Sequence, residues 1–151
     1  MSYAKPILEK ESDPFEICFQ VVNMMGGVDL DAMTEPERNV ALADRMWGQI
    51  NNGGYEQYFF NDGLEYPKEC LNALNTIGLP RSAALLKEAL EVLGDTTEYT
   101  IASDEIRAAL SDLDDRFYRI EDEPFPQTAA YIRANVDAFG WQGDNGQNKA
   151  E

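Results

Sequence analysis

The chain has 151 residues, a length that suits one domain built around one hydrophobic core. Its apolar share of 44% is ordinary, but 28 acidic residues, 12 basic residues and no histidine give a formal charge of −16. This charge repels nucleic acids and anionic membranes and attracts basic proteins, and the lack of histidine excludes Ser-His and Cys-His catalysis.

The first residues contain no apolar run long enough for a signal peptide, and no segment approaches the length of a membrane span. Cys18 and Cys70 each lie in an apolar helical pattern, so we expect two reduced core residues in a cytoplasmic protein. Two cysteines without histidine argue against zinc, and no phosphate-binding loop is present. We therefore expect neither a metal nor a cofactor.

Two helices are predicted in the first third of the chain. Asp13 is expected to cap the first, with Glu16 completing a capping box, and residues 26–27 end it. A second capping box, Thr34 with Glu37, starts a helix that stops at residues 51–54. The first helix carries, at helical spacing, the apolar residues Phe15, Cys18, Phe19, Val22 and Met25. The second is expected to bury Val40, Ala43, Trp47 and Ile50.

The middle of the chain predicts a central helical hairpin. Pro67 starts one helix that Gly78 closes, and Pro80 starts the next, which Gly94 closes. The connection is very short, so the two apolar faces should pack against each other. These faces comprise Cys70, Leu71, Leu74 and Ile77 on the first helix and Ala83, Leu86, Ala89, Leu90 and Leu93 on the second.

A longer acidic helix is predicted from Ser103, its cap, to about Ile120, with the segment 121–126 breaking it. Its buried seam is Ile106, Leu110, Leu113, Phe117 and Ile120. A last helix is expected from about Gln127 to Phe139, and only residues 98–101 look β-like. The predicted fold is all-α: a compact single domain of six or seven helices over residues 1–140, followed by a flexible polar tail over 141–151.

The acidic residues are concentrated in one region. Between Glu88 and Glu123, twelve acidic residues and three arginines give a net charge of 3 − 12 = −9. Spacings of 7, 3 and 7 place four carboxylates on one stripe of the long helix, and two more lie on the exposed side of the preceding helix. The candidate phosphate-mimicking residues are Glu88, Glu91, Glu105, Asp112, Asp115 and Asp122. The alternative is that Arg116 and Arg119 simply pair with Asp112 and Asp115 within the helix.

Two possible cation sites are weaker. The segment starting at Asp29 begins like a calcium loop, but Thr34 and Val40 occupy the positions that need glycine and glutamate, so we reject it. Three carboxylates of the long helix could hold a divalent cation loosely, although a solvated helix face is favoured. They are Asp112, Asp114 and Asp115.

Residues 51–63, NNGGYEQYFFNDG, could form a base-stacking platform, a ligand pocket or part of the core. No basic residue lies between Arg45 and Lys68, which argues against base stacking. We expect a tight corner at residues 53–54. After it, Tyr55, Tyr58 and Phe59 should point at the core, while Gln57 and Asn61 hydrogen-bond the free backbone.

This segment resembles the signature of the bacterial DNA-mimic protein family (DNA mimic protein 19-like domain). The matching residues are Asn52, Gly53, Gly54, Tyr55, Gln57, Tyr58, Phe59 and Asn61. Residues 131–133 are similar to the family's C-terminal helix, and the resemblance covers about residues 35–140. It implies a helical, acidic, cytoplasmic homodimer. A described member presents a DNA-like surface to a helix-turn-helix transcription factor and keeps it off its operator.

Three functions are therefore considered. The first is a DNA mimic that binds a basic DNA-binding protein and blocks its access to DNA, without binding nucleic acid or membranes itself. The second is an immunity-like or adaptor protein that neutralises another basic partner, such as a toxin. The third is a small enzyme with a pocket near Tyr55, Gln57 and Asn61, which we disfavour because the sequence offers no defined catalytic set.

Overall fold

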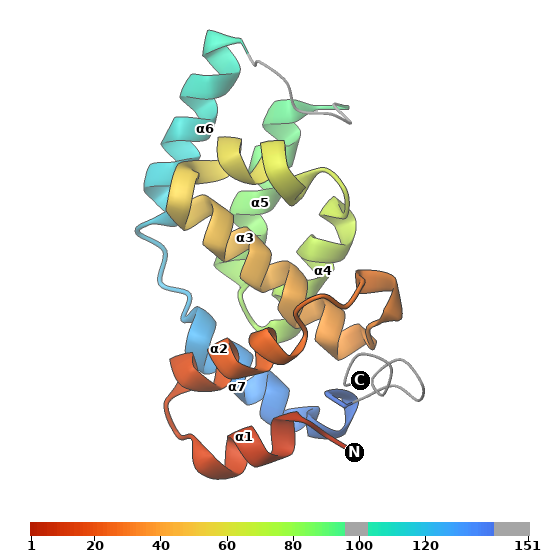
Figure 1. Ribbon diagram of the computed structural model, residues 1–151. Coiled ribbons are helices and arrows are strands. Elements are labelled where there is room, and N and C mark those ends of the chain that lie inside the picture. The colour runs from red at the N-terminus through yellow and green to blue at the C-terminus, as the bar shows by residue number, and fades with distance from the viewer. Residues whose placement is uncertain (96–102, 141–151) are drawn as a thin grey trace. The chain divides into compact units, whose positions relative to one another are not determined.

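The computed structural model describes residues 1–95 and 103–140, and these contain seven α-helices, which confirms the all-α prediction (Figure 1). The chain forms two compact units, one of residues 1–41 with residues 123–140, the other within residues 42–122. The β-like segment predicted at 98–101 and the predicted tail at 141–151 lie outside the described residues. The domain limits 1–140 and 141–151 stay a prediction. Within the described part of the chain, no helix is long and apolar enough to cross a membrane.

The unit that contains the N-terminus is built from short helices. They are α1 (Ala4–Lys10), α2 (Pro14–Met24), the 3-10 turn η1 (Leu30–Ala32), the start of α3 (Glu35–Tyr58), α7 (Pro124–Ala134) and the 3-10 turn η3 (Val136–Ala138). Helix α2 packs against α7, and α1 packs against both α2 and η3. Its buried side chains include Ile7, Ile17, Cys18, Val21, Ala129 and Ile132.

The face that α2 buries is Ile17, Cys18, Val21 and Met25. Two residues of the apolar set found by helical spacing lie outside this face: Phe15 is 47% exposed and Phe19 is 53% exposed. The buried residues and the exposed phenylalanines both recur at helical spacing along α2. Periodicity alone therefore does not say which apolar stripe meets the core.

The two predicted capping boxes have different outcomes. The box at Thr34 is confirmed: its N–H donates to the Glu37 carboxylate (2.9 Å), and the Glu37 N–H donates to the Thr34 hydroxyl (3.3 Å). The box at Asp13 is wrong. Asp13 occupies the N-cap position of α2, as predicted, but its side chain makes no capping hydrogen bond. The Glu16 side chain instead accepts a hydrogen bond from Gln20 (3.3 Å).

Glu37 connects the two ends of this unit. Its side chain is 5% exposed and also accepts a hydrogen bond from the Tyr3 hydroxyl. The Thr34 hydroxyl lies 2.9 Å from the carbonyl of Ala138, in η3. The buried carboxylate thus has hydrogen-bond donors for its oxygens, as a buried charge requires.

The unit of residues 42–122 holds the rest of α3 and three further helices, α4 (Pro67–Ile77), α5 (Pro80–Leu93) and α6 (Asp104–Phe117). The predicted helical hairpin is confirmed, because α4 packs against α5 and Gly78 joins them at φ 102°, which favours glycine. Helix α5 also packs against α6. The core includes Met46, Ile50, Tyr55, Leu74, Leu86, Leu110 and Phe117.

Three predicted details in the helices needed correction. Trp47 is half-buried, and the adjacent Met46 is the fully buried residue. Helix α6 begins after its Ser103 cap as predicted but ends at Phe117, before Ile120. Helix α7 begins at Pro124 and ends at Ala134, followed by η3, so the last helix starts and stops earlier than expected. A proline in the first helical turn removes an N–H that has no helical partner anyway, so it starts this helix instead of blocking it.

We expect Glu37→Ala to lower the free energy of unfolding by about 1–3 kcal/mol, because the Tyr3 hydroxyl and the Thr34 N–H lose their acceptor. Urea unfolding followed by circular dichroism measures this. The matched control is Glu35→Ala, an exposed carboxylate in the same helical turn, which should change stability by less than about 0.5 kcal/mol. Equal effects of the two changes would contradict the role of Glu37.

Candidate protein-binding surface

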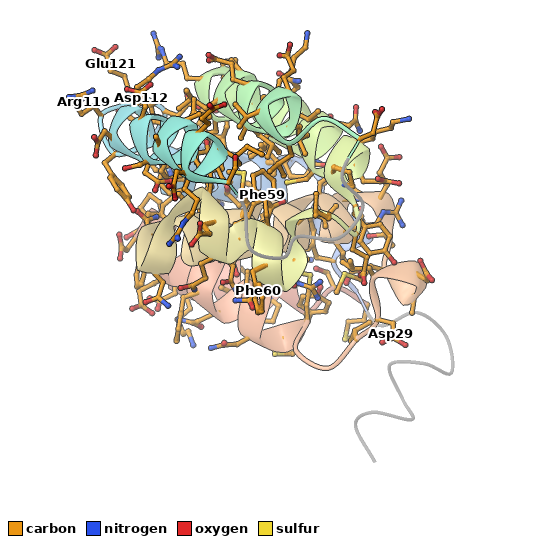
Figure 2. The ribbon with its side chains drawn as sticks, turned by 90° about the horizontal axis from the view of Figure 1, so that it is seen from above. Asp29, Phe59, Phe60, Asp112, Arg119 and Glu121 are labelled. Atoms are coloured by element: carbon orange, nitrogen blue, oxygen red, sulfur yellow. The ribbon has the colours of Figure 1, made fainter. Side chains whose placement is uncertain are left out.

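Helix α3 breaks at Gly53 and Gly54, whose backbone angles are non-helical (Gly54 φ 78°, ψ −177°). The chain then turns through Tyr55, Tyr58 and Phe59, which are 0%, 3% and 2% exposed. The prediction of a tight corner with three aromatics in the core is confirmed. Phe60 is 69% exposed and lies on the other side of this segment from Phe59 (Figure 2).

The amide side chains after the corner bond to the side chain of Gln49, which precedes the corner, and not to the backbone, so that prediction was wrong. The side-chain N–H groups of Gln57 and Asn61 both donate to the side-chain oxygen of Gln49, at 2.8 and 2.9 Å. Gln49 in turn donates to Asp62 (3.3 Å). This network joins the two sides of the corner. It leaves Gln57 and Asn61 occupied with structural contacts.

The corner is fixed to α6 by Asp114. The backbone N–H of Tyr55 donates to the Asp114 carboxylate (2.8 Å). A Cβ atom on Gly54 would lie 2.4 Å from the same carboxylate, so only glycine allows this approach. Burial raises the pKa of the Asp114 carboxyl, while the hydrogen bond from Tyr55 acts in the opposite direction. A second link is the ion pair of Arg107 with Glu56 (3.1 Å).

Because Asp114 points into the corner, the three aspartates of α6 do not converge on a cation. No group of three or more acidic or cysteine side chains arranged for a metal ion occurs among residues 1–95 and 103–140. Asp112 and Asp115 remain exposed on α6, as does Glu105.

A shallow groove of about 350 Å³ runs between α5 and α6. It brings together three of the predicted acidic residues, Glu88, Glu91 and Asp112. Its other lining residues are Val92, Ala109, Leu113 and Arg116. Figure 2 shows Asp112 on the outer side of α6. Glu105 and Asp115 lie on the same helix without lining the groove.

Arg116 connects the two helices of the groove. Its guanidinium donates two hydrogen bonds to the Glu88 carboxylate, at 3.0 and 2.7 Å. This contact holds the pKa of Glu88 below its ordinary value. The alternative of a pair within α6 between Arg116 and Asp112 is therefore replaced by a pair between helices, which leaves the carboxylate of Asp112 in the groove.

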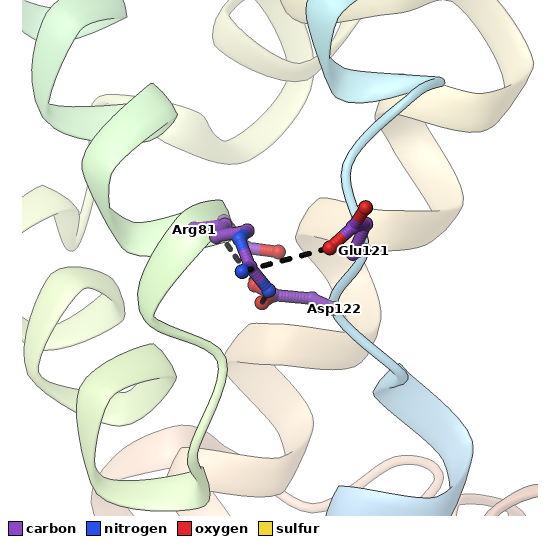
Figure 3. Close-up of polar contacts among 4 residues, drawn as sticks. Arg81, Glu121 and Asp122 are labelled. Atoms are coloured by element: carbon purple, nitrogen blue, oxygen red, sulfur yellow. Dashed lines mark hydrogen bonds and ion pairs between the residues drawn. The ribbon is translucent and has the colours of Figure 1, made fainter.

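Asp122 does not belong to the predicted surface. Its side chain is only 3% exposed. It accepts a hydrogen bond from the backbone N–H of Ser82 (2.7 Å) and lies 3.9 Å from Arg81, which also pairs with Glu121 (Figure 3). Helix α5 starts after Leu79, which has no capping side chain, so Asp122 supplies the missing acceptor from forty residues away. The sequence does contain a signal for this contact, because Leu79 at the start of α5 cannot cap the helix and a distant acceptor is needed. We did not use this signal and placed Asp122 on the surface.

These features define a small acidic α-helical protein with an exposed acidic groove supported by a glycine corner. A family model described as DMP19-like protein matches residues 31–135, which is 105 of the 151 residues. The chain therefore belongs to the DMP19-like protein family, and the resemblance predicted from the signature is confirmed. Searches of curated proteins and of solved structures each gave no significant match.

Gly54→Ala should lower the free energy of unfolding by at least about 2 kcal/mol, because the positive φ and the Asp114 carboxylate both exclude a methyl group. Gly48→Ala is the matched control: it lies in α3 with open space around it, and alanine should raise stability by up to about 1 kcal/mol. Thermal and urea unfolding of both variants measure these changes. If Gly54→Ala were as stable as the wild type, the corner would not constrain α6.

Asp122→Ala should lower the free energy of unfolding by about 1–3 kcal/mol, because the Ser82 N–H loses its acceptor. Glu121→Ala, beside it and exposed, should stay within about 0.5 kcal/mol of the wild type. Urea unfolding compares the two. Unchanged stability in Asp122→Ala would return this residue to the candidates for partner binding.

Proposed function

We propose that this protein is a DNA mimic that binds a basic DNA-binding protein, such as a helix-turn-helix transcription regulator, and blocks its access to DNA. The observation that carries the proposal is the exposed groove in which Glu88, Glu91 and Asp112 meet, on a chain of charge −16. Membership of the DMP19-like family supports it, through the DNA-mimic activity that the resemblance implies. The proposal assigns no catalytic role.

The spacing of the carboxylates suits this role. Residues three apart on a helix are about 4.5 Å apart along its axis, which applies to Glu88 and Glu91 on α5 and to Asp112 and Asp115 on α6. Duplex DNA carries one charge per about 1.7 Å of axis, so one pair of helices is sparser than DNA. A homodimer, which the family resemblance implies, would add further rows of charge. We include the homodimer in the proposal.

The mechanism is electrostatic competition. Lysine and arginine side chains that contact phosphates on DNA would instead contact Glu91 and Asp112, whose carboxylates line the groove. A surface of this sign speeds association and makes it depend strongly on salt. The Glu88 carboxylate already binds Arg116, so a partner arginine would have to exchange with an internal one there.

One observation favours the alternative of an immunity-like or adaptor protein that neutralises another basic partner. The groove is lined in part by Val92, Ala109 and Leu113, and a phosphate backbone offers no such apolar contact. These side chains suit any basic protein with an apolar residue beside its charges. A toxin gene beside the gene for this protein would favour neutralisation. A regulator gene in that place would favour DNA mimicry.

The test has two steps. Proteins captured from a cell extract by the immobilised chain at low and high salt are identified by mass spectrometry. Each purified partner is then bound to its labelled DNA, and fluorescence anisotropy follows the release of that DNA as this protein is added. Release that weakens with salt supports mimicry. A captured partner that keeps its DNA, or that binds no DNA, would contradict it.

Neutralising the groove should weaken binding to that partner. We expect Glu91→Gln with Asp112→Asn to raise the Kd about tenfold at low salt, and to reduce the salt dependence. The matched control is Glu65→Gln with Glu69→Gln, which removes two exposed carboxylates of the same unit outside the groove. Equal weakening in both double variants would show that net charge, not the groove, carries the binding.

A further inference from the structure

Helices α2 and α7 present three exposed aromatic side chains on the unit that contains the N-terminus. Phe15, Phe19 and Phe125 are 47%, 53% and 41% exposed. The rings of Phe15 and Phe19 stack with centroids 6.0 Å apart, and Phe125 packs edge-on against Phe15 at 5.0 Å. Single exposed apolar residues are common, but three packed together form a continuous patch, which marks an interaction surface.

This aromatic patch, defined as Phe15, Phe19 and Phe125, has a fixed base. Ile17 and Cys18, on the adjacent face of α2, are buried, and α2 packs against α7. The Cys18 thiol also lies 3.5 Å from the carbonyl of Phe125, which ties the first turn of α7 to α2. The rings are therefore positioned by the core below them, and a partner would not have to order them.

Carboxylates lie along one side of the patch. Glu16 and Gln20 follow Phe15 and Phe19 in sequence and form the next row on the helix. The Gln20 side chain donates to the carboxylates of both Glu11 (2.7 Å) and Glu16 (3.3 Å), which holds two negative charges together. Lys10 precedes Glu11, but residues 11–37, which carry both carboxylates and the rings of Phe15 and Phe19, contain no lysine or arginine.

We propose that the aromatic patch is a docking site for a basic amphipathic segment of a partner protein. Apolar side chains of that segment would cover the rings, while its lysine or arginine side chains would bind Glu11 and Glu16 or stack on the ring faces. The proposal concerns a different unit from the acidic groove, and it does not depend on the groove binding anything.

Charge decides between the possible occupants. A second copy of this chain, docked by two-fold symmetry, would place Glu11 and Glu16 against a surface with the same carboxylates. An anionic membrane would be repelled in the same way. A basic partner gains from both the rings and the carboxylates, and so it is the occupant that the surface fits.

A defined peptide pair tests the proposal with the full chain. One labelled peptide is an amphipathic helix of leucine, lysine and arginine, and the other has the same composition in scrambled order. The wild type should bind the amphipathic peptide at least about tenfold more tightly than the scrambled one in fluorescence anisotropy. Phe15→Ser with Phe19→Ser should remove this preference, because the two rings are lost.

Two controls separate the patch from other sites. Phe60→Ser changes a 69%-exposed phenylalanine outside the patch, and the groove variant Glu91→Gln with Asp112→Asn changes the other surface; both should keep the preference. If circular dichroism shows that the serine variant is unfolded, Glu11→Gln with Glu16→Gln replaces it. This variant should raise the Kd for the amphipathic peptide about tenfold, because two carboxylates beside the patch lose their charge.

The proposal is overturned if the wild type shows no preference, or if the preference survives in the folded patch variant. It is also overturned if sedimentation shows a wild-type dimer that the patch substitutions dissociate, because the occupant is then a second copy. Failure of the groove variant to affect DNA release would instead count against the proposed function and leave the peptide result unchanged.

Discussion

The hydrogen bond from the Tyr55 N–H to the Asp114 carboxylate is the contact on which the acidic groove depends. It requires the backbone of Gly54, which lies against that carboxylate with a positive φ. Asp114 lies between the exposed residues Asp112 and Asp115 on α6, so fixing it fixes the rotation of the helix about its axis. The signature segment thus orients the surface and need not touch a partner.

The acidic residues of this region have three different physical roles. Asp114 and Asp122 accept backbone hydrogen bonds and hold helices together. Glu88 is paired with an arginine of the neighbouring helix. Others, among them Asp112, have no such contact and leave their carboxylates exposed at the groove. The surplus charge is therefore partly structural, and a count of acids overstates the charge that a binding surface can use.

Local signals in the sequence were sufficient for the helices. Pro67, Gly78 and Pro80 each act on their own turn, and the Thr34 box joins residues three apart. The sequence could not predict contacts whose two ends lie far apart. Asp122 caps a helix forty residues earlier, and the stripe of α2 that is buried is chosen by α7, more than a hundred residues later. Periodicity describes one helix, whereas these outcomes depend on its neighbours.

The division of the chain has a consequence for the order of folding. Residues 42–122 are continuous, so all the segments of that unit are synthesised before α7. The other unit needs α7 against α2, which joins residues such as Cys18 and Phe125 across 107 positions. Closing so long a loop is slow and entropically costly. During synthesis the helices of the groove can therefore assemble before the other unit is complete, while α2 waits for α7 to cover its apolar face.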